Sequence, residues 1–325
     1  MARGQRTLTG RATLGALALG MVLLGGCDKL QQVVQPGKAA TDSAIPPGLS
    51  PQFFPPEGFV WGAYHPANLP EVRYGVASPP ANPKAQVLIL ADASYPAEVY
   101  FQAAQQLLDA GYGVWLLEAP GQGGSGRYLL QGENIFTPDY RDAETAARAF
   151  ITDIVKPDPS KPLVVVGTGY SAVHALSLSL SLKDADILGY VAYDPYLGGP
   201  IARGSVWHAN EPPGTYWGDI AQTWQSANPG LRLRVKSEAW QKQMEKAYAA
   251  LDGLHMPALG DAVHPSVLLL EPKTGLTADD NAASKLCAHV AHCAMAPGDG
   301  PQTLGTAVAG FVDRVLPHGT VDGAQ

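Results

Sequence analysis

A short glycine-containing turn holds the residues whose types and spacing come closest to a catalytic pattern. The apolar run at 163–166 is typical of a strand buried on both faces of a sheet, and the sequence GTGYS follows at 167–171. The next segment, rich in Ala and Leu, predicts a buried helix. In the pattern G-x-S-x-G, such a strand, turn and helix present a serine nucleophile two places after the first glycine. Gly169 stands at that place and has no side chain that could attack a substrate.

The elements around this turn predict an α/β fold with a doubly wound, mostly parallel sheet, because buried strands alternate with helices. The Leu-Ser alternation at 176–182 has the period of a strand, but we expect a helix there because the turn must lead into one. Other helices are expected at 96–110, 137–154 (Thr137 as N-cap, Pro138 first), 235–251, 278–287 and 303–315, and strands at 58–64, 71–77, 85–90, 113–117, 163–166, 187–193, 267–270 and 292–296.

Four stretches carry a resemblance to a known family. The sequence EAPGQGGS at 118–125 looks like a D-x-R-G-H-G-x-S turn, and KPLVVVGTGYS at 161–171 looks like a nucleophile elbow. The strand at 267–270 and the APG at 296–298 look like the approaches to a catalytic acid and a catalytic histidine. Together they resemble the monoacylglycerol lipase and lysophospholipase branch of the α/β-hydrolases, which is also grouped with the serine aminopeptidases. The resemblance implies an α/β-hydrolase core at 59–196 and 264–318, interrupted at 197–263 by a tryptophan-rich cap and followed by a tail at 319–325.

The resemblance also locates the positions that a serine hydrolase needs. Nucleophile, acid and base fall on Gly169, Gly275 and Pro301, none of which can do that chemistry. The loop that should donate to the oxyanion contains Asp92, whose carboxylate would repel a developing negative charge. We therefore expect a degenerate triad, no catalytic residue by motif and no cofactor.

A relocated site is the alternative. Ser171 lies two residues beyond the expected nucleophile, and Asp194 follows the strand at 187–193, where some α/β-hydrolases carry the acid. The base would be His292, or else His289 or His318. This arrangement would make the protein an active carboxylic-ester hydrolase of the lipase and esterase type, with His174 interpreted only as a buried, hydrogen-bonded histidine of the core helix.

Several polar residues should gather at the C-terminal edge of the sheet, where open α/β folds bind ligands. Under the cap they would line a pocket for a polar or cationic small molecule, or remain as an emptied cleft with solvated polar groups. The lysines of the predicted helix at 235–251, Lys236 among them, are expected on a solvated face. The candidate pocket residues are Asp92, Gln122, Gly169, Tyr170 and Asp194.

The N-terminus predicts a lipid anchor. Residues 1–26 combine a basic start with a short apolar core, and LGGC at 24–27 resembles a bacterial lipobox, in which Cys27 would be acylated. Several acyl chains would hold the protein stably on a bilayer, in the cell envelope, facing the periplasm or the exterior. The Pro- and Gln-rich stretch at 27–58 is expected to be a tether. The formal net charge of −7 argues against a nucleic-acid partner.

The two remaining cysteines, Cys287 and Cys293, favour a disulfide in an oxidising compartment. A metal site with His289 and His292 is the alternative, because thiolate and imidazole suit zinc, but we expect no metal.

These observations favour a membrane-anchored, hydrolase-like lipoprotein without serine-hydrolase activity, which binds a small ligand or an envelope protein through the old cleft or the cap. The rival functions are the ester hydrolase that uses Ser171 and a purely structural envelope lipoprotein.

Overall fold

The structure is a computed structural model that describes residues 37–129, 134–182, 184, 186–202, 207, 214–252, 265–272, 275–276, 281–290 and 292–317. The predicted signal segment at 1–26, Cys27, His318 and the tail at 319–325 lie outside these residues.

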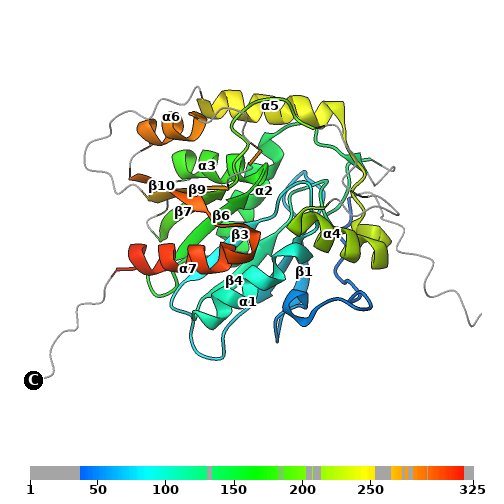
Figure 1. Cartoon of the computed structure of the whole chain (residues 1–325), viewed down its shortest axis with the longest axis horizontal. Helices are drawn as coiled ribbons and strands as arrows, with labels where there is room; N and C mark the ends of the chain where they lie inside the picture. The colour runs from blue at the N-terminus through cyan, green and yellow to red at the C-terminus, as the bar shows by residue number, and fades with distance from the viewer. Residues whose placement is uncertain are drawn as a thin grey trace, which may run out of the picture. The chain divides into compact units, whose positions relative to one another are not determined.

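An eight-stranded sheet forms the centre of the domain, in the order β1-β2-β4-β3-β6-β7-β9-β10 (Figure 1). Strand β2 runs antiparallel to both of its neighbours, and the other strands are parallel. The predicted doubly wound, mostly parallel sheet is confirmed. The strands are β1 (Val60–Tyr64), β2 (Val72–Ala77), β3 (Gln86–Leu90), β4 (Gly113–Leu117), β6 (Leu163–Thr168), β7 (Ile187–Tyr193), β9 (Ser266–Pro272) and β10 (Cys293–Gly298).

Helices cover both faces of the sheet (Figure 1). Side chains of α1, α4 and α7 pack in one apolar cluster, and those of α2, α3, α5 and α6 pack in the other, on the opposite face. The α-helices are α1 (Phe101–Asp109), α2 (Arg141–Phe150), α3 (Ser171–Ser181), α4 (Tyr216–Ala227), α5 (Glu238–Asp252), α6 (Ala282–His289) and α7 (Leu304–Val315). Shorter helical segments are η1 (Pro51–Phe53), η2 (Ala97–Tyr100), η3 (Ile151–Val155), η4 (Pro229–Leu231) and η5 (Pro301–Thr303).

The two strands at the centre of the sheet, β3 and β6, are fully buried. Every residue of β3 and β6 is buried, as expected for strands covered on both faces. The segment with the Leu-Ser alternation is helical, as predicted, because α3 is packed between the sheet and neighbouring helices and buries residues on most of its circumference. Strand β6 and helix α3 therefore hold the turn between them rigidly.

Two helix starts differ from the prediction. Helix α2 begins at Arg141 instead of Thr137, because the Thr137 hydroxyl donates to the Asp139 carbonyl (2.8 Å) and the Asp139 carboxylate accepts the Arg141 amide (3.0 Å), which forms a turn. Helix α5 begins at Glu238, since residues Val235–Lys236 form strand β8 and pair with β5 (Asn134–Ile135). Lys236 is consequently buried, and the expectation that it lies on a solvated helix face is wrong.

Part of the predicted tether lies against the domain. The Gly37 amide donates to the Arg127 carbonyl (2.9 Å), the Ala40 amide to the Gly124 carbonyl (2.7 Å) and the Ala44 amide to the Asn228 side chain (2.7 Å). The stretch at 27–58 thus contains a bound segment from residue 37 onward. None of the helices in the described ranges is long and apolar enough to cross a membrane.

Candidate functional site

The turn between β6 and α3 has the geometry of a nucleophile elbow. Gly169 adopts φ +55°, a left-handed conformation that glycine tolerates best, and its amide donates to the Tyr193 carbonyl (2.9 Å). Helix α3 begins two residues later, at Ser171. The backbone thus makes the sharp bend that the glycine-containing pattern predicts, with Gly169 at its apex.

The carboxylate of Asp92 fills the space above this apex. Asp92 lies two residues beyond the end of β3, and its Oδ2 atom is 1.7 Å from the position that a Cβ atom on residue 169 would take. Any side chain at residue 169 would therefore collide with Asp92. The place of a serine nucleophile is taken by an acidic side chain from the neighbouring strand end.

Hydrogen bonds hold Asp92 in this place. Its Oδ1 atom accepts the amide of Ser94 (2.7 Å), and the amide of Tyr170 also bonds to its carboxylate. The amide of Asp92 itself donates to the Tyr100 hydroxyl oxygen (2.9 Å). In a serine hydrolase the amide after the nucleophile donates to the oxyanion, so Asp92 occupies a donor that catalysis would need.

Burial and charge set the ionisation of this group. Burial raises the pKa of Asp92, while the positive charge of Lys236 acts in the opposite direction. Lys236 is itself buried, which lowers its pKa, and its Nζ atom lies 5.4 Å from the centre of the Tyr170 ring. Lys236 is the main residue that sequence reasoning missed, because nothing in its local sequence distinguishes it from the exposed lysines of α5.

A second carboxylate stands at the predicted acid position. Asp194 follows β7, has φ +50°, and accepts the amide of Leu276 through Oδ1 (2.7 Å). The same Oδ1 atom is 2.6 Å from where a Cβ on Gly275 would lie. Burial, helped by the negative charges of Asp92 and Glu271, raises the pKa of Asp194 to about 7, although the hydrogen bond from the Leu276 amide acts in the opposite direction. Two of the three empty triad positions, Gly169 and Gly275, are therefore filled by a carboxylate from elsewhere in the chain.

The remaining predicted pocket residues lie at the same edge of the sheet. The Tyr170 ring packs against Trp240 of α5, with ring centres 4.9 Å apart. Gln122 follows β4 and is buried, and its Oε1 atom has no hydrogen-bond partner within the described residues. Pro301, at the expected base position, begins η5 after β10. Asp92 thus lies against Gly169 and accepts the Tyr170 amide, and Asp194 lies against Gly275.

Neither His292 nor His289 completes the relocated triad predicted from the sequence, and the third candidate base, His318, lies outside the described residues. The Ser171 hydroxyl donates to the Ala91 carbonyl (2.6 Å) at the C-terminal ends of the strands. His292 precedes the first residue of β10 and is exposed, and His289 ends α6 just before it, so both lie toward the opposite edge of the parallel sheet. The interpretation of His292 or His289 as a base for Ser171 is therefore wrong.

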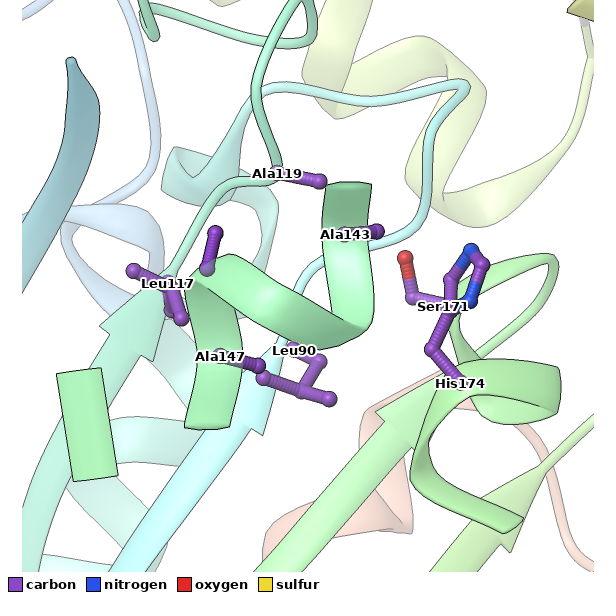
Figure 2. A pocket seen from close by; sticks show the side chains of 8 residues that line it. Leu90, Leu117, Ala119, Ala143, Ala147, Ser171 and His174 are labelled. Carbon is purple, nitrogen blue, oxygen red and sulfur yellow. The ribbon is translucent and has the colours of Figure 1, made fainter. Parts of the chain in front are cut away.

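Ser171 instead shares a pocket with His174, which lies one turn further along α3 (Figure 2). The Nδ1 atom of His174 is 3.6 Å from Oε1 of Glu144 and has no hydrogen-bond partner within the described residues. The expectation of a fully hydrogen-bonded core histidine is corrected on this point. The pocket is lined by Leu90, Leu117, Ala119, Ala143, Ala146, Ala147, Ser171 and His174.

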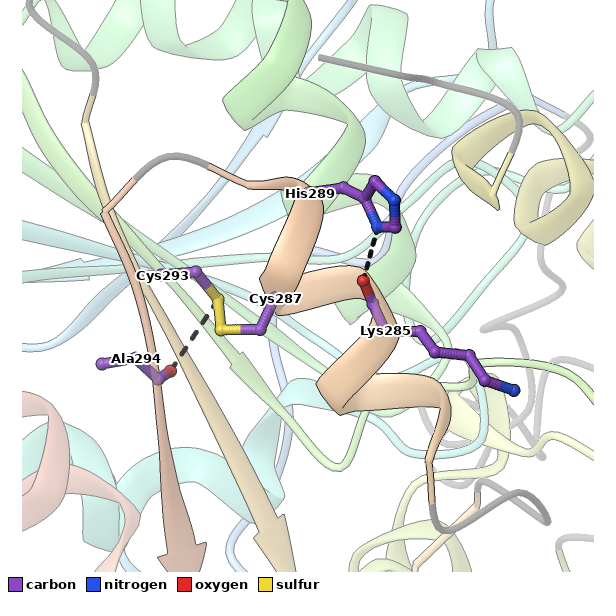
Figure 3. The surroundings of a disulfide bond; sticks show 5 residues. All are labelled: Lys285, Cys287, His289, Cys293 and Ala294. Atoms are coloured by element: carbon purple, nitrogen blue, oxygen red, sulfur yellow. Dashed lines mark hydrogen bonds between the residues drawn. A yellow bond between two sulfur atoms is a disulfide. The ribbon is translucent and has the colours of Figure 1, made fainter. Parts of the chain in front are cut away.

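The predicted disulfide is confirmed. Cys287 of α6 and Cys293 of β10 are bonded, with Cα atoms 5.3 Å apart (Figure 3). His289 points away from this bond, and its Nδ1 atom contacts the Lys285 carbonyl oxygen (2.6 Å). Because both sulfurs are in the disulfide, neither is a thiolate that could bind the metal considered as the alternative.

Solved structures that resemble this chain include several ester-cleaving enzymes. A thermostable carboxyl esterase from Bacillus coagulans superposes with a TM-score of 0.59 at 10% identity, over 80% of this chain and 99% of its own. A monoglyceride lipase from Saccharomyces cerevisiae gives 0.57 at 13% identity, over 87% and 98%, and a monoacylglycerol lipase from Paleococcus ferrophilus gives 0.50 at 14%, over 73% and 97%. At these identities the likeness establishes the α/β-hydrolase fold.

No curated protein matches the sequence. The family model described as serine aminopeptidase, S33, matches residues 81–246, just over half of the chain. Judged by these relatives alone, an active ester hydrolase is better supported than a hydrolase-like protein without activity. The matched region contains Asp92, the turn at Gly169 and helix α3, and it shows that the chain belongs to the serine aminopeptidase S33 family of α/β-hydrolases.

Proposed function

We propose that this protein, unlike an active member of its family, performs no serine hydrolysis at the elbow. Instead it binds a small polar ligand at the position where the family has its active site. The observation that carries the proposal is the 1.7 Å separation between Asp92 Oδ2 and the Cβ position of Gly169. It removes the space for a nucleophile and occupies an amide of the oxyanion site at the same time. The relatives argue for hydrolysis, but the geometry of this chain argues for a changed use of the cleft.

The groups at this edge favour a ligand that brings hydrogen-bond donors or a positive charge. Burial raises the pKa values of Asp92 and Asp194 because it disfavours their charged forms. A cation beside them would favour the charged carboxylates and would be attracted by them. Burial raises the pKa values of Tyr95, Tyr170 and Tyr193, and the negative charge of Asp194 acts in the same direction on all three. Carboxylates and aromatic rings together suit an organic ammonium ion.

Ligand-induced stabilisation tests this part of the proposal. We expect ethanolamine and choline to raise the midpoint of thermal unfolding, and glycerol 3-phosphate not to raise it. The variant Asp194→Asn should abolish the increase, whereas the exposed control Asp252→Asn should retain it. Equal stabilisation of the wild type and Asp194→Asn would contradict binding at this edge, and no stabilisation by either amine would favour a purely structural lipoprotein.

The proposed location is the bacterial cell envelope. The lipobox-like sequence LGGC at 24–27 supports acylation of Cys27 and a lipid bilayer as partner, facing the periplasm or the exterior. An envelope protein is the proposed macromolecular partner if no small ligand binds. Metabolic labelling with a palmitate analogue should mark the wild type and not Cys27→Ser, and labelling of both would contradict the anchor.

An ester hydrolase that uses Ser171 is the second candidate. Its support comes from the family and from the pocket that Ser171 shares with His174. A fluorophosphonate probe decides between the two functions, because it labels an activated serine covalently. We expect no labelling. Labelling that is lost in Ser171→Ala and retained in Ser177→Ala, a control on the same helix, would establish the second candidate instead.

A further inference from the structure

The first described residues of the chain are fastened to one edge of the sheet. The Gly37 amide donates to the Arg127 carbonyl (2.9 Å), and the Gly37 carbonyl accepts the Glu71 amide (2.9 Å). Glu71 directly precedes β2, in which Tyr74 pairs with Leu117, the last residue of β4. Because β2 runs antiparallel to β4, the start of β2 lies beyond the carboxyl end of β4. Gly37 is therefore held at the C-terminal edge of the parallel strands.

The same edge carries the proposed ligand site. Strand β4 is parallel to β3, β3 to β6, and β6 to β7, so the loops that follow these strands leave the sheet at one edge. Those loops hold Asp92, Gly169 and Asp194. The Ala40 amide also donates to the Gly124 carbonyl (2.7 Å), in the turn after β4, so the attachment extends over several residues.

Two large apolar side chains are exposed at this edge. Leu129 is 47% exposed and lies two residues beyond Arg127, so the Cα atoms of these two residues are within about 8 Å of each other. Val235 is 41% exposed and precedes Lys236, whose Nζ atom lies 5.4 Å from the centre of the Tyr170 ring. Singly exposed apolar side chains are common on protein surfaces, so the informative feature is their place beside the attached segment and the elbow.

The length of chain between the proposed lipid anchor and this attachment limits how the domain can lie on a membrane. Cys27 and Gly37 are ten residues apart, and ten residues in any arrangement span at most about 35 Å. A globular domain of this size is about 50 Å across. An acylated Cys27 would therefore let the C-terminal edge of the sheet rest on the bilayer, but the chain is too short for the opposite edge to do so.

We propose that the acylated protein lies on the bilayer with the C-terminal edge of the sheet turned toward the lipid and with Leu129 and Val235 at the level of the head groups. The inference rests on the lipid anchor of the proposed function and adds which face of the domain meets the membrane. Asp92 and Asp194 would then face the membrane surface, where the ammonium groups of phospholipids are concentrated.

Fluorescence quenching by labelled lipid tests this orientation. Leu129→Cys, Val235→Cys and Lys161→Cys each add one thiol for the fluorophore NBD, while the two cysteines within the described ranges are joined in the disulfide. The acylated full chain is reconstituted on phosphatidylcholine vesicles in which part of the lipid carries a nitroxide near the head group. We expect loss of most of the fluorescence at residues 129 and 235. Lys161 is exposed and lies two residues before β6, at the opposite edge, so its probe should remain unquenched.

Flotation with the same vesicles separates the orientation from the anchor. The wild type should float and Cys27→Ser should not. Equal flotation of both proteins, or flotation of neither, would overturn the anchor and the orientation with it. If flotation does depend on Cys27, quenching at Lys161 as strong as at Leu129 would overturn the orientation alone. Unquenched probes at both positions would place the domain away from the lipid and would also overturn the orientation.

Discussion

The Oδ2 atom of Asp92 lies 1.7 Å from the Cβ position of Gly169, although the two residues belong to different strand ends of the sheet. A glycine at the apex of the elbow is therefore required by its neighbour as well as by its own φ of +55°. The same relation recurs at Gly275, where a Cβ would lie 2.6 Å from Asp194 Oδ1. At both positions a carboxylate occupies the space of the side chain that the family pattern expects.

Restoring a serine at the elbow should not restore catalysis. In Gly169→Ser the new side chain would collide with Asp92, and Pro301 would still stand at the position of the base. Since loss of the base alone costs several powers of ten in rate, we expect no hydrolysis of 4-nitrophenyl butyrate above the buffer rate. The control is Gly169→Ser combined with Asp92→Gly, which should fold better and remain inactive. Turnover by the single variant would show that the residues have been assigned to the wrong roles.

The stability of the protein should depend on pH through Asp194. Its pKa is raised from an ordinary value near 4 to about 7, so the folded state holds a proton that the unfolded state releases. Stability contributed by this group is therefore lost as pH rises from about 4 through about 7. Asp194→Asn, which keeps an acceptor for the Leu276 amide, should be more stable than the wild type at pH 8 and nearly equal at pH 4.

Urea denaturation at several pH values measures that difference. The exposed control Asp252→Asn should show no growing difference from the wild type over the same range. If the advantage of Asp194→Asn were constant with pH, or larger at pH 4, the raised pKa of Asp194 would be contradicted.

The disulfide should contribute modestly to stability. Cys287 and Cys293 are six residues apart, so the bond closes a short loop and restricts the unfolded chain only a little. Replacing both with serine should lower the free energy of unfolding by about 2 kcal/mol. Reducing the wild type with dithiothreitol should have the same effect and should leave the double variant unchanged. Loss of stability on reduction of the double variant would point to another cause.

Helix α5 should be held mainly by Trp240. This side chain is fully buried and packs against the Tyr170 ring, whereas Lys242 of the same helix is exposed and pairs with Glu238. Trp240→Ala should lower the free energy of unfolding by about 3–5 kcal/mol, and Lys242→Ala by less than about 0.5 kcal/mol. Similar small effects in both variants would mean that α5 is not part of the cooperative core.

The sequence predicted the fold well because the signals for its elements are local. Apolar runs such as 163–166 and 187–193 define buried strands, and the glycine-containing turn defines the elbow. Helix starts were less accurate. At Thr137 a local hydrogen bond to Asp139 forms a turn in place of the expected helix start, and at Val235 the chain pairs with a strand that is distant in sequence.

The contents of the site were only partly predictable. The absence of a nucleophile at Gly169 could be predicted from the pattern, but the carboxylate of Asp92 that fills its place could not. Asp92 and Gly169 are far apart in sequence, and only the pairing of β3 with β6 brings their loops together. The burial of Lys236 and the position of His174 beside a pocket likewise depend on packing between elements, for which a single sequence has no local signal.

A double-mutant cycle between Gly169 and Asp92 tests the central claim most directly. Gly58→Ala is the reference, because Gly58 has a similar left-handed φ of +74° with nothing within 4 Å of its Cβ position, and it should cost about 1 kcal/mol. We predict that Gly169→Ala costs at least about 3 kcal/mol in the wild type and falls to the Gly58→Ala value in an Asp92→Gly background, a coupling of about 2 kcal/mol. An equal cost of Gly169→Ala in both backgrounds would show that Asp92 does not occupy the place of the nucleophile.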